Sequence, residues 1–516
     1  MDRREFLKTS ALASAGLALG AGERAPLGPA AAAPGTAARP HIILLMTDQH
    51  RGDALGCAGH PAVRTPHLDA LAARGARFIN AFSSTPSCTP ARAGLLTGLS
   101  PWHHGLLGYG RVARRYEFEM PRLLAQLGYF GFGIGKMHWF PQKSLHGFEG
   151  TLVDESGRVE EEGFVSDYRN WFHLEAPGLD PDATGIGWNE HRAGPYALDE
   201  RLHPTAWTGA TAVRFIENYK PAKPLFLKVS FARPHSPYDP PRRVLDRIDP
   251  QRIPLRVVGD WASEFAAYPD TPDAAYGDFG EAHAAAARRH YCANIAFIDD
   301  QIGAILAALK KKGFLDNALV LFTSDHGDML GDHHHWRKTY PYQGSARIPL
   351  LIQWPAAWTA GTPRGAVLAQ PAELRDVLPT FLDAAGAEIP SRMDGRSLLS
   401  LVRNPASAWR EAIDLEHAQI YRPGNYWGGM TDGRTKYVWF YPDGREMLFD
   451  LAKDPGEKHD AAGDPACRKT LESWRARFAE HLAERGEGFV QGGRPVVRKE
   501  SLLYGPLYPA DEPPAR

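Results

Sequence analysis

The sequence has few cysteines and almost no net charge, and both shortages exclude classes of function. Its 516 residues include four cysteines, Cys57, Cys88, Cys292 and Cys467, and no C-x-x-C pair. We therefore expect neither a disulfide scaffold nor a cysteine-ligated zinc site. The formal net charge of -1 leaves no overall basic field, so we expect no nucleic-acid partner.

Long hydrophobic runs are also missing beyond the N-terminus, so we expect no stable membrane span. The opening stretch, MDRREFLKTSALASAGLALG, pairs Arg3 with Arg4 ahead of a short apolar run. This pattern is typical of a twin-arginine export signal. We expect residues 1–38 to be signal and linker, the twin-arginine translocon to be a partner, and the mature protein to be periplasmic or secreted. A disordered or membrane-anchoring tail is the alternative.

Short apolar runs alternate with helical patterns along the rest of the chain. Buried strands are expected at 42–46, just before and including Ile134, at 225–229 and at 319–322. Between them, Pro66 begins a helix that stops at Gly75, and two further helices end near Leu127 and Gly313. This alternation predicts an α/β fold with a large, mainly parallel sheet sandwiched by helices.

The texture of the sequence changes twice. The segment 150–222 is rich in Trp, Gly, Pro and acidic residues and is expected to be an insertion over the sheet edge. After about Leu401, alternating residues and a PDG turn indicate a small antiparallel sheet, followed by a helix. We therefore divide the chain into a main domain at 39–400 and a smaller C-terminal subdomain at 401–516.

Polar side chains follow two of the expected strands. Asp48 and Gln49 follow one strand, and Asp325 and His326 follow another. The ends of parallel strands face the same crevice, so these four groups are expected to converge. A set made mostly of oxygen ligands favours Ca²⁺ or Mg²⁺ over Zn²⁺. Either pair alone is equally compatible with an ordinary strand end or helix cap.

Cys88 stands at the expected start of a helix in the stretch PSCTPARAGLLTG. A helix N-terminus and Arg92 would both stabilise a thiolate there. The residues alone leave three readings open: a buried structural thiol, a thiolate nucleophile, or the precursor of another group.

The stretch CTPAR resembles the C-x-P-x-R core of the formylglycine-dependent sulfatases of the alkaline phosphatase superfamily, and AGLLTG extends the match. GYFGFGIGKMHW resembles their second signature, with Gly131 where Ser or Thr is usual. TDQH, RPHSPYDPP, SDHGDMLGDHHHWRK and LFDLAKDPGE resemble further blocks in the family's order. The resemblance spans Asp48 to Glu457 and implies an alkaline phosphatase-like fold with a sulfatase catalytic domain at 39–400.

The resemblance implies that Cys88 is oxidised to formylglycine (3-oxoalanine) by a formylglycine-generating or anaerobic sulfatase-maturating enzyme. The hydrated aldehyde carries two hydroxyls on one carbon. One attacks sulfur as the alcohol leaves, and the other loses its proton to expel sulfate. A serine would lack the second hydroxyl.

The resemblance also assigns roles to individual residues. Arg92 would hold the hydrate, Lys136 and Lys338 would grip the sulfate oxygens, His138 would accept the proton that triggers sulfate release, and His235 would act as general acid. The metal, Ca²⁺ by preference, would be held by Asp48, Gln49, Cys88, Asp325 and His326. Taken singly, the lysines fit solvated surface residues, and the histidines fit core or turn residues.

The implied function is hydrolysis of a sulfated small molecule or saccharide, and two alternative functions remain open. One is a phosphonate or phosphate ester hydrolase on the same scaffold, and the other is a catalytically silent carbohydrate-binding protein. Specificity is expected from 150–222, from the arginines at 111–115, and from a loop with Tyr421, Arg422, Asn425 and Trp427. The arginines fit a solvated face equally well, and aromatic and polar residues in such a loop are also common packing elements. The histidines at 333–335 are interpreted as loop residues near the pocket and not as metal ligands.

Overall fold

The computed structural model describes residues 39–220, 222–267 and 271–509, and the expected export signal lies outside them. Its central element is an eight-stranded sheet with the order β5-β4-β6-β1-β7-β8-β2-β9. The strands are β1 (His41–Asp48), β2 (Ala76–Phe78), β4 (Phe130–Gly135), β5 (Gly150–Val153), β6 (Leu225–Pro234), β7 (Ala318–Ser324), β8 (Leu350–Gln353) and β9 (Ala366–Leu368).

The sheet is mainly parallel, as the sequence predicts. β1 pairs in parallel with β6 on one side and β7 on the other, and only β8 runs antiparallel to its neighbours β7 and β2. The run from Ile42 to Met46 is completely buried. A strand covered on both faces has no reason to alternate polar with apolar residues, which explains this continuous apolar run.

Helices cover both faces of the sheet. On one face, Leu44 and Met46 pack against α3 (Cys88–Thr97), α5 (Met120–Gln126), α11 (Val377–Ala384) and α12 (Leu399–Arg403). On the other face, Ile43 and Leu45 pack against α2 (Pro66–Ala73), α7 (Pro204–Asn218) and α9 (Glu281–Lys311). Further helices are α4 (Pro101–His104), α6 (Asp167–Glu175), α8 (Arg242–Leu245) and α10 (Gln343–Ala346).

The segment 150–222 is more regular than the expected insertion. It contributes the edge strand β5, the helix α6 and the covering helix α7. The loop between α6 and α7 is the irregular part. β5 escaped the sequence reading because it has only four residues, GTLV, three of which are partly exposed at the sheet edge.

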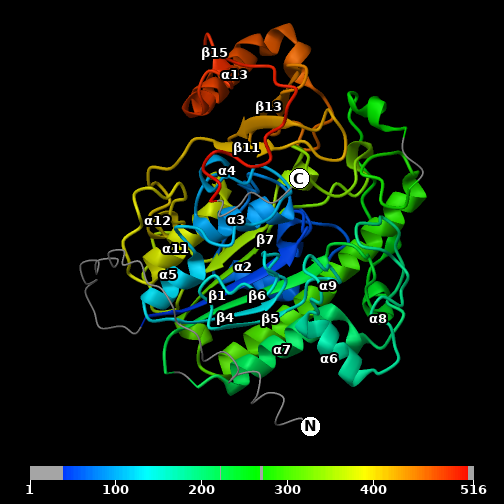
Figure 1. Ribbon diagram of the computed structural model, residues 1–516, viewed down its shortest axis with the longest axis vertical. Coiled ribbons are helices and arrows are strands. Elements are labelled where there is room, and N and C mark those ends of the chain that lie inside the picture. The colour runs from blue at the N-terminus through cyan, green and yellow to red at the C-terminus, as the bar shows by residue number, and fades with distance from the viewer. Residues whose placement is uncertain (1–38, 221, 268–270, 510–516) are drawn as a thin grey trace.

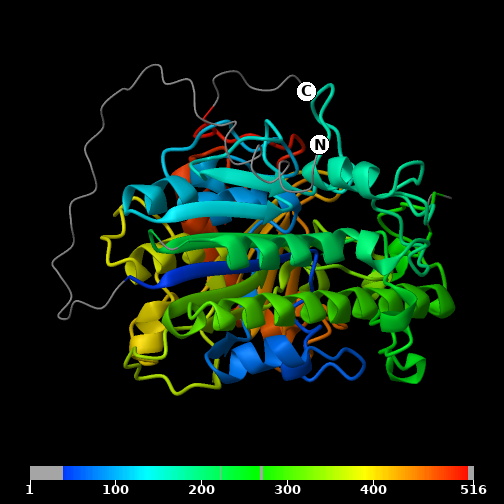
Figure 2. The same cartoon turned by 90° about the horizontal axis from the view of Figure 1, so that it is seen from below.

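Helix α9 corrects the expectation that no later segment is apolar enough for a membrane span. By length and composition it passes that test, alone among the described residues. However, 72% of its most apolar window is buried inside the protein, where it covers the sheet. Figure 2 shows it as the long green helix that crosses most of the molecule.

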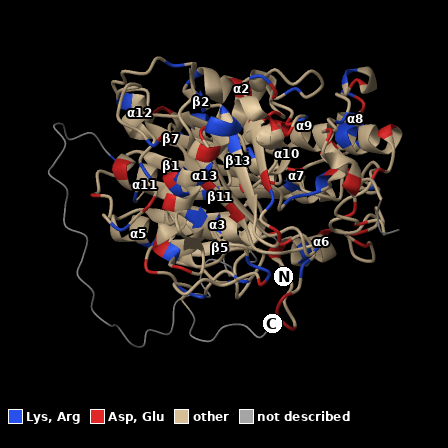
Figure 3. Ribbon diagram, turned by 90° about the horizontal axis from the view of Figure 1, so that it is seen from above, with Lys and Arg blue, Asp and Glu red and all other residues tan. Residues whose placement is uncertain are grey.

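A separate antiparallel sheet lies toward the C-terminus, in orange in Figure 1. Its strands are β11 (Ile413–His417), β12 (Trp427–Thr431), β13 (Thr435–Phe440) and β14 (Glu446–Asp450), and α13 (Arg468–Leu482) packs on it. Two-stranded ladders join β3 (Ala81–Phe82) to β10 (Ala372–Glu373) and β15 (Val490–Gln491) to β16 (Arg494–Pro495). This sheet and helix match the predicted C-terminal architecture. Acidic and basic residues are interspersed over the fold, in keeping with the near-zero net charge (Figure 3).

Candidate active site at the carboxyl end of the sheet

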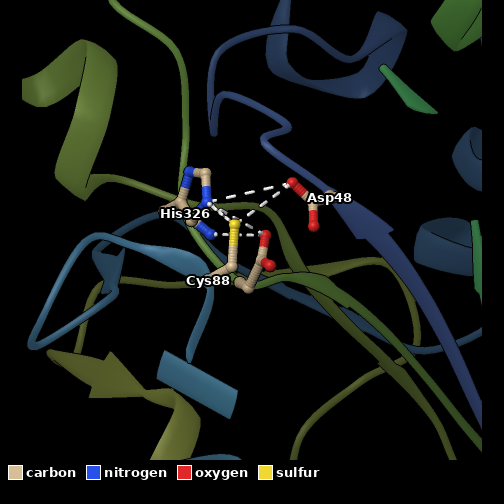
Figure 4. A group of neighbouring side chains, drawn as sticks. Asp48, Cys88 and His326 are labelled. Carbon is tan, nitrogen blue, oxygen red and sulfur yellow. Dashed lines mark hydrogen bonds and ion pairs between the residues drawn. The ribbon is translucent and has the colours of Figure 1, made fainter. Parts of the chain in front are cut away.

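Four side chains meet where β1 and β7 end. Asp48, Cys88, Asp325 and His326 are buried, and each offers one ligand atom that lies within 4.8 Å of the others. The Cys88 sulfur points toward His326 and Asp48 (Figure 4). The register explains the meeting: Thr47 of β1 pairs with Ser324 of β7, so the next residue of each strand leaves the sheet at the same edge.

Arg92 ties the two carboxylates together from the second turn of α3. Its Nη2 lies 3.1 Å from an oxygen of Asp48 and its Nε 2.9 Å from an oxygen of Asp325, and all three side chains are fully buried. Its Nη1 donates to the carbonyl oxygen of Lys136 at 2.8 Å. A buried charge that loses its partner strongly destabilises a protein. Arg92 and the two carboxylates therefore depend on one another to stay buried.

Cationic groups surround the Cys88 sulfur. Lys338 Nζ lies 3.1 Å from Sγ and His326 Nε2 lies 3.2 Å from it, while Lys136 Nζ lies 2.6 Å from Asp48 Oδ2. Burial and the Asp48 carboxylate raise the pKa of the thiol, but Lys338, Lys136 and His326 outweigh them and leave that pKa below its ordinary value. The pocket therefore favours an anion at this position.

Gln49 is held by a residue that the sequence analysis did not single out. Its Nε2 donates to Asp328 Oδ2 at 2.6 Å, and its backbone N–H donates to Asp325 Oδ1 at 3.0 Å. Its Oε1 is buried and has no hydrogen-bond donor in the described part of the chain. The place of Asp328 in SDHGD, two residues beyond His326, was the available signal.

This donor set fits a hard divalent cation. An unpaired buried amide oxygen is costly unless an electropositive group meets it. The Gln49 oxygen belongs to the same strand end as the Asp48 carboxylate, and Asp325 supplies a second carboxylate. Oxygen donors of this kind suit Ca²⁺ or Mg²⁺.

His235 is neutral and hydrogen-bonded at both ring nitrogens. Its Nδ1 lies 2.9 Å from the Ser236 carbonyl oxygen, which can only accept, so Nδ1 carries the hydrogen. Its Nε2 then accepts from Lys338 Nζ at 2.9 Å. Burial, and next the Lys338 charge, hold the pKa of His235 well below its ordinary value. In this arrangement the nearest available proton is on Lys338.

Trp188 forms a wall of this pocket, and no sequence pattern pointed to it. Its ring stacks on His235 with centroids 3.8 Å apart and planes 12° apart. The Lys136 ammonium lies 4.8 Å from the same ring centroid. Trp188 comes from the irregular loop between α6 and α7, so only the folded chain brings it to the strand ends.

His138 lies close to a different set of groups. Its backbone N–H donates to Glu155 Oε1 at 2.8 Å, and its Nε2 lies 3.5 Å from the hydroxyl of Tyr109. Within the described residues it makes no hydrogen bond to Cys88. Burial, and next Arg158, hold the pKa of His138 well below its ordinary value. Its role in proton transfer stays a prediction.

The structure separates the residues expected to select substrate. Trp427 is fully buried, with its Nε1 donating to the Thr339 carbonyl at 2.9 Å, and Asn425 is buried against the Thr339 hydroxyl. These two cannot stack on a sugar, and their aromatic-polar pattern reflects packing. Tyr421 and Arg422 remain partly exposed. His333 packs against the Trp261 ring and His335 against the Tyr340 ring, and the histidines at 333–335 lie outside the four-residue cluster.

Comparisons with known proteins agree with this geometry. The Sulfatase family model matches residues 40–387, and a model described as N-sulphoglucosamine sulphohydrolase, C-terminal, matches 331–484. An arylsulfatase of Clostridium perfringens is 36% identical, covering 88% of this chain and 97% of its own. A choline-sulfatase of Rhizobium meliloti is 30% identical, covering 93% and 94%. The solved phosphonate monoester hydrolase of Agrobacterium radiobacter is 25% identical with a TM-score of 0.71, covering 89% and 100%.

Proposed function

The chain belongs to the sulfatase family, and from this premise we propose that it hydrolyses sulfate esters at a formylglycine made from Cys88. It is an enzyme, a hydrolase acting on sulfuric ester bonds. The observation that carries the proposal is the position of Cys88 at the start of α3, with Lys338, His326 and Asp48 around its sulfur.

The modification accounts for features that a simple thiol would not need. A buried cysteine nucleophile requires one base and one oxyanion site. Here the sulfur lies among two carboxylates and three cationic side chains, an arrangement suited to a small, many-oxygen group. The aldehyde, once hydrated, supplies the attacking hydroxyl and a second hydroxyl for sulfate release.

The fixed cations suit the charge of the reacting ester. Lys338 and Lys136 would contact sulfate oxygens, where their charges stabilise the negative charge that develops during S–O cleavage. Lys338 and His235 Nε2 share one hydrogen bond, so the proton of the Lys338 ammonium can be held by either group and donated from that position to the departing alkoxide. Arg92 holds both carboxylates in position through its two ion pairs.

We propose Ca²⁺ as the metal, held by Asp48, Gln49, Asp325 and His326 together with the modified side chain of residue 88. Bound there, the cation would lower the pKa of a neighbouring hydroxyl and neutralise charge on the ester. The carboxylates, the unpaired Gln49 oxygen and their burial support this choice. Removing the metal with a chelator and restoring activity with Ca²⁺ or Mg²⁺ in turn would test it.

Peptide mass spectrometry across Cys88, paired with kinetics, tests the proposed function. We expect the converted peptide to be about 18 Da lighter than the thiol peptide, because conversion removes the elements of hydrogen sulfide and adds one oxygen. We also expect turnover of 4-nitrophenyl sulfate in proportion to the converted fraction. An intact, alkylatable thiol in fully active protein would overturn the formylglycine proposal. An intact thiol in inactive protein that still binds sugars would favour a silent carbohydrate-binding protein.

A phosphonate or phosphate ester hydrolase is the second candidate, favoured by the match to the phosphonate monoester hydrolase. Sulfate and phosphonate esters are both tetrahedral anions and suit the same cations. Comparing kcat/KM for phenyl esters of sulfate and phenylphosphonate decides between them. A preference for the phosphonate would replace the proposed sulfate ester as the main substrate.

We also propose export of the folded protein by the twin-arginine translocon, after Cys88 has been converted by a maturation enzyme in the cytoplasm. The pairing of Arg3 and Arg4 ahead of a short apolar run supports this route. Replacing both arginines by lysine should retain active enzyme in the cytoplasm. Unchanged export of that variant would contradict the proposal.

A further inference from the structure

A cavity of about 290 Å³ lies beside the reaction site, and Trp188 lines it. The Trp188 ring also contacts His235 and Lys136, so this residue borders both the cavity and the groups predicted to act on the leaving oxygen. The volume lies near the lower end of the range for small-molecule sites in proteins.

Unpartnered polar atoms gather on the cavity wall. The Asp154 side chain is buried, and its Oδ2 has no hydrogen-bond partner among the described residues. The same holds for the Ser156 hydroxyl and for Nε of both Arg158 and Arg169. Buried donors and acceptors are normally paired. Four such atoms on one wall indicate a ligand, or ordered water, that offers both donors and acceptors.

The charges of the wall balance. Three carboxylates, Asp154, Asp182 and Asp239, face three guanidinium groups, Arg158, Arg169 and Arg233. Arg233 is held by Asp239 through two hydrogen bonds of 2.8 and 3.0 Å. Because the wall has as many acidic as basic groups, it gives a ligand with a net charge no overall advantage and favours a neutral ligand.

Apolar groups complete the wall, among them Trp188, Tyr168 and Ile186. Alternating aromatic faces and hydrogen-bonding groups match a ring that has C–H faces and hydroxyls on its rim. A planar aryl group would fill the same space but leave the Asp154 and Ser156 oxygens unpaired, which disfavours its binding.

We propose that this cavity binds the alcohol part of the sulfate ester, and that this alcohol is a neutral, polyhydroxylated ring of monosaccharide size. The assignment rests on the proposed sulfate ester hydrolysis and narrows it to saccharide sulfates. Asp154, Arg169 and Ile186 are then specificity residues that act on the alcohol and leave the sulfur chemistry to the strand ends.

Paired substrates test the assignment on enzyme with converted Cys88. A monosaccharide 6-sulfate reports on the hydrogen bonds of the cavity, and 4-nitrophenyl sulfate, whose ring cannot make them, reports on the reaction site. We expect Asp154→Asn and Arg169→Gln each to lower kcat/KM for the sugar sulfate about 10-fold, mainly through KM. Turnover of 4-nitrophenyl sulfate should change by less than about twofold.

Arg192→Gln is the matched control. Arg192 also pairs with a carboxylate, Glu190, from the same loop, but its side chain is 53% exposed and does not line the cavity. It should alter neither substrate. Equal losses for both substrates in the cavity variants, or no loss for the sugar sulfate, would overturn the proposal.

Binding of an unsulfated ring separates this inference from the proposed function. Methyl β-D-galactopyranoside and methyl β-D-glucopyranoside are observed by ligand-detected NMR with the wild type and with Ile186→Trp, which fills the cavity. Binding of either glycoside that is lost in Ile186→Trp supports the cavity as a sugar site even if neither ester is turned over. Failure of both to bind the wild type, or binding that Ile186→Trp leaves intact, overturns it.

Discussion

The reaction site and the cavity share Trp188, yet they differ in charge. At the strand ends, Arg92, Lys136, Lys338 and His326 outnumber the carboxylates of Asp48 and Asp325, and every one of these groups is buried. Around the cavity, acidic and basic groups are equal in number. The reaction site therefore selects its ligand by charge, and the cavity selects its ligand by hydrogen bonding and shape.

Removing the reactive side chain should break this comparison most completely. Cys88→Ala is expected to lower turnover of both aryl and sugar sulfates by about 10⁴-fold or more, because alanine cannot be converted to formylglycine and supplies no attacking hydroxyl. Cys292→Ala is the control: this thiol belongs to α9 and is buried in an apolar cluster, so activity should persist with slightly lower stability. Steady-state rates of Cys88→Ala above a tenth of wild type would contradict the assignment.

Removing Arg92 should lower both the free energy of unfolding of the protein and the rate at its reaction site. Arg92→Leu leaves the Asp48 and Asp325 carboxylates buried without their partner, which should cost about 3–5 kcal/mol in the free energy of unfolding. Urea denaturation measures this loss. Arg403→Gln breaks the exposed pair with Asp383 and should cost less than about 1 kcal/mol. Similar losses in both variants would show that burial does not set the difference.

Lys338→Ala separates charge from shape within the reaction site. It should lower kcat about 10²–10³-fold for both substrates, because charge on the sulfate oxygens loses a fixed cation. In unconverted protein the pKa of the Cys88 thiol should also rise, since Lys338 lowers it, so the midpoint of thiol alkylation moves to higher pH. Lys311→Ala, on the exposed end of α9, is the control. An unchanged alkylation midpoint would contradict the electrostatic reading.

The shared wall is tested by shortening it. Trp188→Ala should reduce kcat/KM about 10-fold for either substrate, because it removes the ring that packs on His235 and Lys136 and borders the cavity. Trp188→Phe should retain most of the activity because an aromatic ring remains. If Ala and Phe behave alike, the stacking does not position His235.

The smallest effect on turnover is expected for a histidine that lies outside both the reaction site and the cavity. Burial, and next Arg375, lower the pKa of His104 to about 3, so the unfolded chain binds one more proton between pH 6.5 and 3. Stability is therefore lost as pH falls through that window, by up to about 1.4 kcal/mol per pH unit. His104→Gln should flatten the decline in Tm across this range while leaving turnover at neutral pH unchanged. An equally steep decline in the variant would show that His104 stays protonated when folded.

The reaction site was predictable from the sequence because its residues follow strong local patterns. Asp48 and Asp325 each follow a continuous apolar run, and neighbouring parallel strands have to deliver such residues to one edge. The start of α3 at Cys88 follows from the C-terminal run of small residues and leucines beyond it, with Pro90 in the first turn. Backbone geometry therefore brings the two carboxylates together, whereas the place of Cys88 beside them was implied only by the family resemblance.

The cavity was not predictable because its residues have no periodic pattern. Trp188 and Asp154 lie in irregular chain, and Asp239 joins them only because β6 ends next to β4 and β1. The loop that contains Trp427 was compatible with sugar binding and with packing, and the structure shows packing for this residue, since β12 buries its ring and its N–H donates to the Thr339 carbonyl oxygen. Composition predicts what a loop contains, whereas tertiary packing decides which side chains face a ligand.

The connection from β5 to β6 supplies most of the cavity wall, since 12 of its 16 residues fall between Asp154 and Trp188. The reaction groups, by contrast, are scattered from Asp48 to Lys338. Mutations in this one short segment can thus change which alcohol is accepted and leave the residues that carry out hydrolysis unchanged. Grafting residues 154–188 between related enzymes is accordingly a compact route to exchanging their substrate preferences.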